Sequence, residues 1–131
     1  GNICRSPMAE FVMKSLTDQL KIESRATSSW EHGNPIHRGT QAIFKKYAIA
    51  YDRDKTSQQI SPADFADFDY VIGMNESNVR DLKRMAPEDF QHKIYQFEEE
   101  SVPDPWYTGD FDQTYDLVLA GCKKWLERLD G

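Results

Sequence analysis

The sequence predicts an α/β fold, a single three-layer domain over residues 1–131 in which helices flank both faces of a parallel sheet. Two observations support this prediction. Segments with apolar residues at helical spacing alternate with short β-like segments along the whole chain. The segment Tyr70-Val71-Ile72-Gly73-Met74 is apolar without alternation, which is typical of a strand covered on both faces. In such a sheet a ligand binds at the carboxyl ends of the strands.

The first two helices are predicted from apolar stripes. The first begins near Ser6 or Pro7, because proline is tolerated in the first turn of a helix. A second helix covers about residues 36–47. The inward residues are Met8, Phe11, Val12, Leu16 and Leu20 in the first helix, and Ile43, Phe44 and Tyr47 in the second.

The remaining elements follow in order. Residues 24–30 are β-like and residues 51–59 form a polar loop. Ser61-Pro62-Ala63-Asp64 predicts an N-cap and a short helix, since proline suits the first helical position. A helix over about 76–85 follows the apolar strand, and a further strand covers 92–97. The last helix is the clearest element, and its stripe consists of Phe111, Tyr115, Val118, Cys122, Trp125 and Leu129.

Composition and charge narrow the class of protein. A hydrophobic content of 39% and a charged content of 29% are those of an ordinary soluble globule. The net charge of −6 argues against nucleic-acid binding, which needs a basic face. No apolar run of about eighteen residues predicts a membrane span, and no secretory signal is recognised. Cys4 and Cys122 make no disulfide framework, so a cytoplasmic protein is expected.

No cofactor and no metal are expected. His32, His37 and His92 lack the spacing of metal ligands, so surface or helix-capping roles are expected for them. Asp110 and Asp112 suit the N-terminal turn of the last helix, where the helix dipole favours negative charge.

The most informative segment is Gly1-Asn2-Ile3-Cys4-Arg5-Ser6-Pro7-Met8-Ala9-Glu10, which is typical of a phosphate-binding loop that leads into a helix. A turn glycine, an arginine and Ser-Pro at a helix start suit a phosphate dianion. The helix N-terminus points N–H groups at the anion, and the guanidinium of Arg5 can contact two of its oxygens.

This segment resembles the signature C-x-G-N-x-C-R-S-P of the low-molecular-weight protein tyrosine phosphatases. Three further blocks match in order: Trp30 to Pro35, Phe65 to Asn78, and Asp104-Pro105-Trp106-Tyr107. They resemble the family's aromatic active-site loop, its central strand with the following helix start, and the Asp-Pro-Tyr-Tyr loop that holds its general acid. The resemblance implies hydrolysis of phosphotyrosine in protein substrates, with inorganic phosphate as product or inhibitor.

The resemblance also implies a role for each matching residue. Arg5 binds and stabilises the transferring phosphoryl group, and Asp104 is the general acid and then the general base. Ser24 and Asn75 support the loop by hydrogen bonds, although the family more often has aspartate at position 75 and histidine at position 55. The residues expected at the phosphate or the substrate are Gly1, Asn2, Ile3, Cys4, Arg5, Ser6, Trp30, Trp106 and Tyr107.

The nucleophilic cysteine of the family lies two positions before Gly1 and is therefore not in the sequence. Cys4 is the inner cysteine of the pattern, and a buried structural role is favoured over a reversible disulfide that protects the catalytic thiol. We therefore expect an N-terminally incomplete domain that is inactive as it stands. The family normally has four strands, and absence of the interior first strand is expected to leave a slot with unpaired backbone groups.

Two of these residues have plain alternatives. Val-Pro-Asp-Pro around Asp104 is also a turn for local reasons, but the opening motif in the same chain favours the catalytic role. Trp30 is either a core aromatic or a wall of the substrate site. The Gly-Asn-Pro turn that follows Trp30 favours the wall.

Three other functions are weighed against tyrosine phosphatase, which is preferred. Thioredoxin-coupled arsenate reductases share the loop but need two further cysteines, and only Cys122 is left. Protein arginine phosphatases carry threonine where Ile3 stands, and the bulkier Ile3 favours a flat phenyl ester. A non-catalytic phosphate-binding or interaction module is the alternative from another class, and the absent nucleophile favours it.

Overall fold

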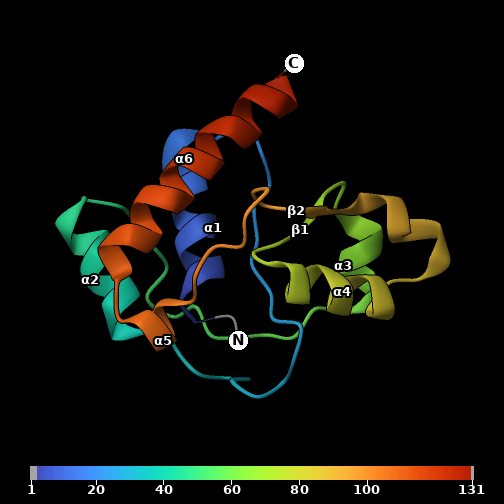
Figure 1. The fold of residues 1–131 in the computed structure, drawn as a ribbon, viewed down its shortest axis with the longest axis horizontal. Coiled ribbons are helices and arrows are strands. Elements are labelled where there is room, and N and C mark those ends of the chain that lie inside the picture. The colour runs from blue at the N-terminus through green and yellow to red at the C-terminus, as the bar shows by residue number, and fades with distance from the viewer. Residues whose placement is uncertain (1–2, 131) are drawn as a thin grey trace.

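The computed structural model describes residues 3–130, and Figure 1 shows their fold. Helices alternate with short strands, as the sequence predicts. The elements are α1 (Arg5–Leu16), α2 (Arg38–Lys46), α3 (Pro62–Asp67), β1 (Val71–Gly73), α4 (Glu76–Met85), the 3₁₀ helix η1 (Glu88–Lys93), β2 (Ile94–Gln96), α5 (Pro105–Thr108) and α6 (Phe111–Asp130).

The two strands lie between two groups of helices. β1 and β2 run parallel, with Val71 opposite Ile94 and Gly73 opposite Gln96. In Figure 1, α1, α2 and α6 lie on one side of the strands and α3 and α4 on the other. This arrangement confirms the α/β fold with helices on both faces of a parallel sheet. β2 starts later than predicted, because residues 92 and 93 end the 3₁₀ helix η1.

The prediction of a strand over residues 24–30 is wrong. Only Ala26 pairs, in one parallel bridge with Gln59. The Ala26 N–H donates to the Gln58 carbonyl at 2.8 Å, and the Ile60 N–H donates to the Ala26 carbonyl at 2.8 Å. Residues 22–27 and β1 both line a cavity. The segment therefore pairs with Gln59 on one edge, and its other edge faces this cavity. A segment without a second partner cannot extend its hydrogen-bond ladder across the sheet.

The main core is formed where α1 packs against α6. The apolar stripe of α6 is confirmed, since Val118 and Cys122 are fully buried and Trp125 is nearly so. The Trp125 indole N–H donates to the Phe97 carbonyl at 2.8 Å, which ties α6 to the segment after β2. No helix in residues 3–130 is long and apolar enough to cross a membrane.

The predicted stripe of α1 is correct only in its first half. Its first three members are buried, whereas Leu16 is 38% exposed and Leu20 is 41% exposed. The helix ends at Leu16, and Thr17 is extended, so the helical spacing stops there. Tyr47 is also more exposed than predicted, because it lies beyond the end of α2 and stacks on Tyr115 with ring centroids 3.9 Å apart.

The helix starts follow local capping chemistry. Ser61 and Asp64 form a reciprocal capping box around Pro62, as predicted for α3. Asn75 accepts a hydrogen bond from the Asn78 N–H at 2.7 Å and caps α4. Asp110 accepts from the Gln113 N–H at 2.9 Å at the start of α6. These caps determine where the three helices begin.

Candidate active site

Arg5 is the first residue of α1, and its side chain is only 12% exposed. Its Nη1 donates to the Val102 carbonyl at 2.8 Å, across 97 positions of sequence. Its Nη2 lies 3.9 Å from the Asp104 Oδ2. Burial lowers the pKa of Arg5, and the Asp104 carboxylate opposes that effect. Arg5, the residue predicted to bind phosphate, thus lies beside Asp104, the predicted general acid.

Asp104 is held by its own backbone neighbourhood. It caps the short helix α5, and its Oδ1 accepts from the Trp106 N–H at 3.0 Å. The Tyr107 N–H donates to the Asp104 carbonyl at 3.0 Å. The turn interpretation of this residue is therefore correct, and it does not compete with a catalytic role. The turn is what directs the carboxylate toward Arg5.

The residues before α1 are anchored by the start of α2. The His37 N–H donates to the Ile3 carbonyl at 2.8 Å, and the Thr40 hydroxyl donates to the Cys4 carbonyl at 3.3 Å. Ile3 and Thr40 are buried. We call the set formed by residues 3–6, 37–40 and 102–111 the α1 corner. These anchors could not be predicted from the sequence, because each joins segments that are distant in the chain.

Cys4 is buried in the α1 corner, with 3% of its surface exposed, and its thiol is free. Burial, followed by the charge of Asp104, raises the pKa of the Cys4 thiol to about 11. A thiol with this pKa stays protonated at neutral pH and is a poor nucleophile. The structural interpretation of Cys4 is thereby supported.

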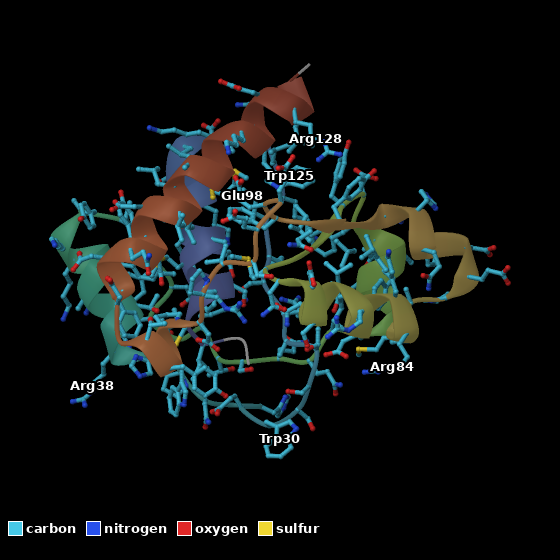
Figure 2. All side chains as sticks on the ribbon, viewed as in Figure 1. Trp30, Arg38, Arg84, Glu98, Trp125 and Arg128 are labelled. Carbon is cyan, nitrogen blue, oxygen red and sulfur yellow. The ribbon has the colours of Figure 1, made fainter. Side chains whose placement is uncertain are left out.

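The predicted aromatic residues lie at the surface. Trp106 is 56% exposed and Tyr107 is 85% exposed, both on α5 next to Asp104. Trp30 is 91% exposed and points away from the body of the molecule in Figure 2, so its interpretation as a core aromatic is wrong. Whether Trp30 contacts a substrate stays a prediction. Gly1 and Asn2 lie outside the described residues, whereas Ser6 follows Arg5 in the first turn of α1.

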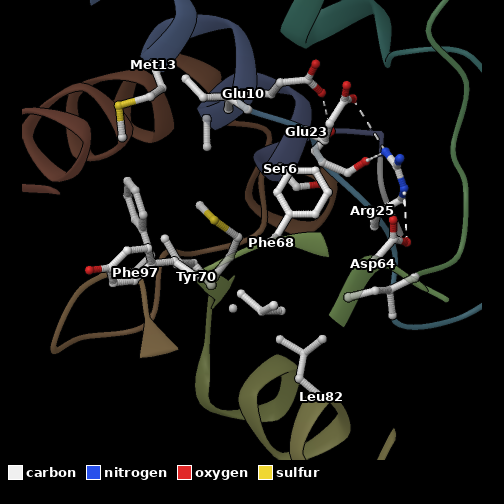
Figure 3. A pocket seen from close by; sticks show the side chains of 18 of the residues that line it. Ser6, Glu10, Met13, Glu23, Arg25, Asp64, Phe68, Tyr70, Leu82 and Phe97 are labelled. Carbon is white, nitrogen blue, oxygen red and sulfur yellow. Dashed lines mark hydrogen bonds and ion pairs between the residues drawn. The ribbon is translucent and has the colours of Figure 1, made fainter. Parts of the chain in front are cut away.

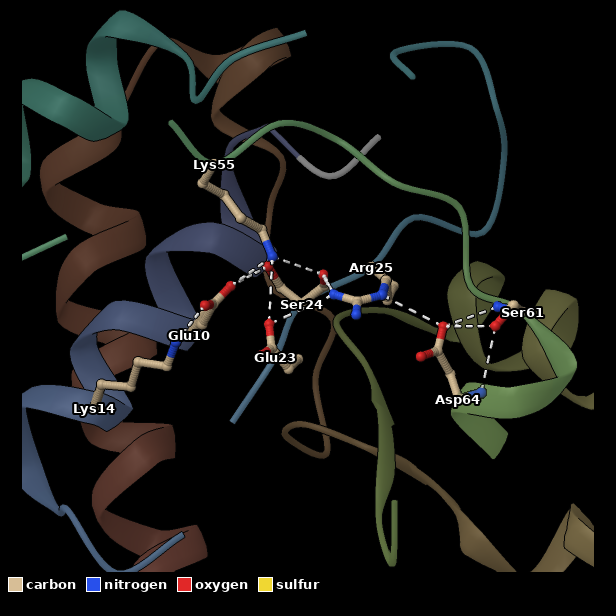
Figure 4. Close-up of polar contacts among 8 residues, drawn as sticks. All are labelled: Glu10, Lys14, Glu23, Ser24, Arg25, Lys55, Ser61 and Asp64. Carbon is tan, nitrogen blue, oxygen red and sulfur yellow. Dashed lines mark hydrogen bonds and ion pairs between the residues drawn. The ribbon is translucent and has the colours of Figure 1, made fainter. Parts of the chain in front are cut away.

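Ser24 belongs to a buried charge network that sequence reasoning missed (Figure 4). Its hydroxyl donates to Glu10 Oε1 at 2.6 Å, and the Lys55 ammonium lies 3.0 Å from the same oxygen. Lys14, one turn along α1, contacts the other oxygen of Glu10 at 2.7 Å. Glu10 itself is 3% exposed. The resemblance pointed to hydrogen bonding at Ser24, but it did not indicate that Glu10 is the buried partner of Ser24, Lys14 and Lys55.

Asn75 makes a capping contact in the structure, and its predicted support of the opening loop stays a prediction. Its side chain caps α4 through the Asn78 N–H, so this contact orders the loop after β1.

The histidines are dispersed, and His37 caps α2 by accepting the Gly39 N–H on Nδ1 at 3.0 Å. Among residues 3–130, no group of histidine, cysteine, aspartate and glutamate side chains is arranged to hold a metal ion.

A cavity of about 390 Å³ lies between α1, residues 22–27 and β1 (Figure 3). We call it the strand cavity. Its walls are mainly apolar, and Arg25 is beside it, where it is paired with Glu23 at 3.6 Å and Asp64 at 3.4 Å. Arg5 and Ser6 line it where it meets the α1 corner.

Known proteins resemble this chain over most of its length. A sequence model of the family described as low molecular weight phosphotyrosine protein phosphatase matches residues 1–131. The low molecular weight protein-tyrosine-phosphatase PtpA of Staphylococcus epidermidis is 41% identical over 133 residues, which cover 93% of this chain and 84% of that protein.

Solved structures agree in fold. The low molecular weight protein tyrosine phosphatase SP-PTP from Streptococcus pyogenes has a TM-score of 0.96 and 61% identity, over 98% of this chain and 87% of that one. The Drosophila arginine phosphatase DARP has a TM-score of 0.89 and 29% identity, over 100% of this chain and 94% of that one.

The α/β fold and these similarities define an enzyme of the protein tyrosine phosphatase class. The chain belongs to the low molecular weight phosphotyrosine protein phosphatase family.

Proposed function

We propose that this protein hydrolyses phosphotyrosine in proteins through a cysteinyl-phosphate intermediate, with Arg5 holding the phosphoryl group and Asp104 as the acid. The observation that carries the proposal is the approach of the Arg5 guanidinium to the Asp104 carboxylate at the N-terminus of α1. A guanidinium and a helix N-terminus bind a phosphate dianion, and a carboxyl group beside them is within reach of the departing oxygen.

In the first step, a cysteine thiolate attacks phosphorus and the bond from phosphorus to the tyrosine oxygen breaks. The protonated Asp104 carboxyl gives its proton to the leaving phenolate, so tyrosine departs neutral. Arg5 stabilises the equatorial oxygens of the phosphoryl group as it transfers. In the second step, water attacks the cysteinyl phosphate, the Asp104 carboxylate takes a proton from that water, and inorganic phosphate leaves with the thiolate restored.

The attacking cysteine belongs two positions before Gly1 in the family signature, and Cys4 is not its substitute. The raised pKa and the burial of the Cys4 thiol support this assignment. Residues 1–131 alone are therefore expected to bind phosphate or sulfate without turnover. Both cysteines of the chain are free and buried, which supports a reducing, cytoplasmic location.

The substrate preference rests on two features. Trp106 and Tyr107 offer exposed aromatic surface beside Asp104, which suits a phenyl ring. Ile3 is apolar where arginine phosphatases carry threonine. The similarity to the Drosophila arginine phosphatase keeps phosphoarginine as the second candidate substrate. Comparing release of phosphate from a phosphotyrosine peptide and a phosphoarginine peptide separates the two, and faster release from phosphoarginine would reverse the preference.

The central test uses the chain extended before Gly1 by a short apolar strand that ends in Cys-Leu, called the extended chain below. Asp104→Ala should slow hydrolysis of phenyl phosphate by about 10²–10⁴-fold, because a general acid matters most for a basic leaving group. The loss should be smaller for nitrophenyl phosphate, because its leaving group, nitrophenolate, is weakly basic and departs without a proton from an acid. Asp112→Ala is the control, as its carboxylate is exposed and pairs only with Lys46 among the described ion pairs. Equal losses for both esters would remove Asp104 from the acid role.

A further inference from the structure

His37 stands where the three segments of the α1 corner meet. Its backbone N–H donates to the Ile3 carbonyl at 2.8 Å, next to the start of α1. Its Nδ1 accepts the Gly39 N–H at 3.0 Å and so caps α2. The backbone bond is available to any residue except proline. The ring contacts described next depend on the side chain.

The imidazole of His37 lies between two aromatic rings from the segment that carries the acid. It stacks on Phe111, with ring centroids 5.1 Å apart and planes 17° apart. It meets Trp106 edge to face at 5.4 Å and 79°. Both geometries are the favoured ones for aromatic pairs. His37 therefore contacts residues on both sides of the turn at Gly109, which has a left-handed φ of 72°.

The absence of a side chain at Gly39 permits this stack. A Cβ placed on Gly39 would lie 2.3 Å from the Cζ of Phe111, which is far inside van der Waals contact. The start of α2 thus combines a capping histidine with a glycine that admits the ring of Phe111. These two residues act together on the same ring.

Trp106 connects the ring of His37 to Asp104, the proposed acid. Trp106 packs on His37, and the Trp106 N–H donates to the Asp104 carboxylate at 3.0 Å. The same carboxylate faces Arg5 at 3.9 Å. Fixing the indole of Trp106 therefore also fixes the amide that orients Asp104.

We propose that His37 is a positioning residue for the phosphatase reaction: its ring holds the α5 turn so that Asp104 faces Arg5. This inference rests on the proposed function, because it assigns to His37 the placement of the proposed acid. His37 touches neither substrate nor reacting atoms in this role. It links the backbone at Ile3 to the segment of residues 104–111.

Two substitutions separate the ring from the cap. His37→Asn keeps a strong N-cap side chain and the backbone bond to Ile3, but it removes the aromatic ring. His37→Phe keeps a ring between Phe111 and Trp106, but it removes the acceptor for the Gly39 N–H. If His37 only caps α2, His37→Phe should lower kcat more than His37→Asn. If its ring positions the α5 turn, His37→Asn should lower kcat more than His37→Phe.

The first measurement uses the chain of 131 residues itself. Amide hydrogen exchange of residues 106–108 should rise in His37→Asn, while the amides of α2 keep their protection. In His37→Phe the first turn of α2 should exchange faster and residues 106–108 should not. Unchanged exchange of residues 106–108 in His37→Asn would overturn the proposal.

The second measurement uses the extended chain. His37→Asn should lower kcat for phenyl phosphate by about 10-fold, since misplacing a catalytic group by a fraction of an ångström is costly. KM should change little, and kcat for nitrophenyl phosphate should fall by less than about twofold. Asp104→Ala is measured in parallel. If Asp104→Ala shows the leaving-group dependence and His37→Asn does not, the inference fails and the proposed function stands; if neither shows it, the proposed function fails.

Discussion

The α1 corner and the strand cavity meet at Arg5 and Ser6, and they are bounded by different kinds of contact. In the α1 corner, segments distant in sequence are joined by directional contacts, such as Arg5 to the Val102 carbonyl at 2.8 Å and His37 to the Ile3 carbonyl at 2.8 Å. The strand cavity has mostly apolar walls around about 390 Å³. The α1 corner is held by hydrogen bonds from side chains and backbone N–H groups to backbone carbonyls, whereas the strand cavity is bounded mainly by apolar side chains.

The two groups of the proposed mechanism lie in the α1 corner. Arg5 is proposed to bind the phosphoryl group and Asp104 to act as the acid, and both are placed by contacts within residues 3–130. The strand cavity borders Arg5 and Ser6. Changes in the α1 corner should therefore act mainly on activity, and changes beside the strand cavity should act on stability.

The largest effect is expected from filling the strand cavity. Extending the chain before Gly1 by a short apolar strand that ends in Cys-Leu should bring nitrophenyl phosphate hydrolysis from background to measurable turnover. The same change should raise Tm by roughly 10 °C, because the buried apolar side chains add a net stabilisation of about 2–3 kcal/mol. Stopped assays with para-nitrophenyl phosphate and thermal unfolding measure the two effects.

The control for this extension ends in Ser-Leu. It should give the same rise in Tm and no turnover, because only the nucleophile differs. Turnover by the unextended chain that Cys4→Ser abolishes would contradict the assignment of the nucleophile. An extension that restores turnover without raising Tm would contradict the role of the strand cavity.

The next largest effect is expected in the α1 corner. In the extended chain, Arg5→Lys should lower kcat for aryl phosphates by about 10²–10³-fold, because an ammonium cannot make the planar two-point contact with the phosphoryl oxygens. Steady-state kinetics at neutral pH measure this loss. Arg84→Lys is the matched control, since the Arg84 side chain is 75% exposed and pairs only with Asp81 among the described ion pairs. A loss of less than about threefold for Arg5→Lys would show that position 5 needs only a positive charge.

A smaller effect, on stability, is expected from the network beside the strand cavity. Glu10→Gln should lower the free energy of unfolding by about 3 kcal/mol, because it leaves the buried Lys55 ammonium without its closest carboxylate. Urea unfolding measures this loss. Lys14→Gln is the control and should cost under about 1 kcal/mol, since the Lys14 side chain is 39% exposed. Equal losses in both variants would show that the network behaves as a surface pair.

The same network predicts a pH dependence. Burial acts to raise the pKa of Glu10, but hydrogen bonds from Lys14 and Ser24 and the charge of Lys55 outweigh it, so the pKa lies below its ordinary value of 4.5. The stabilisation is thus fully present above pH 4.5 and is lost as the pH falls through that value toward the folded pKa. Urea unfolding should show stability falling in this range, and Glu10→Gln should reduce the slope. An unchanged slope would assign the acid sensitivity to other carboxylates.

The smallest effect is expected from the anchor between α2 and the residue before α1. Thr40→Val keeps the shape of this fully buried side chain and removes the hydroxyl that donates to the Cys4 carbonyl. The free energy of unfolding should fall by about 1 kcal/mol. Thr40→Ser retains the hydroxyl and is the matched comparison. If the loss of the methyl group costs more than the loss of the hydroxyl, packing rather than the hydrogen bond anchors this end of α1.

The sequence by itself determined the elements whose signals are local. The stripe of α6 from Phe111 onward, the capping box at Ser61 and the start of α4 after Asn75 all depend on residues within a few positions of one another. The opening motif and the Asp-Pro block also indicated the family. Local chemistry was enough in these cases, because helix capping and amphipathic spacing act within about two turns.

The tertiary structure decided what depends on neighbours distant in the chain. Residues 24–30 have strand-like composition, yet only Ala26 pairs, because a ladder needs a second strand alongside. Glu10 is buried in a helix because Lys55 and Ser24 approach it from other segments. His37 looked like a surface or capping residue, and only the fold brings it between Phe111 and Trp106. Sequence spacing sets the direction of a side chain within its own element, and the packing of elements sets what that side chain meets.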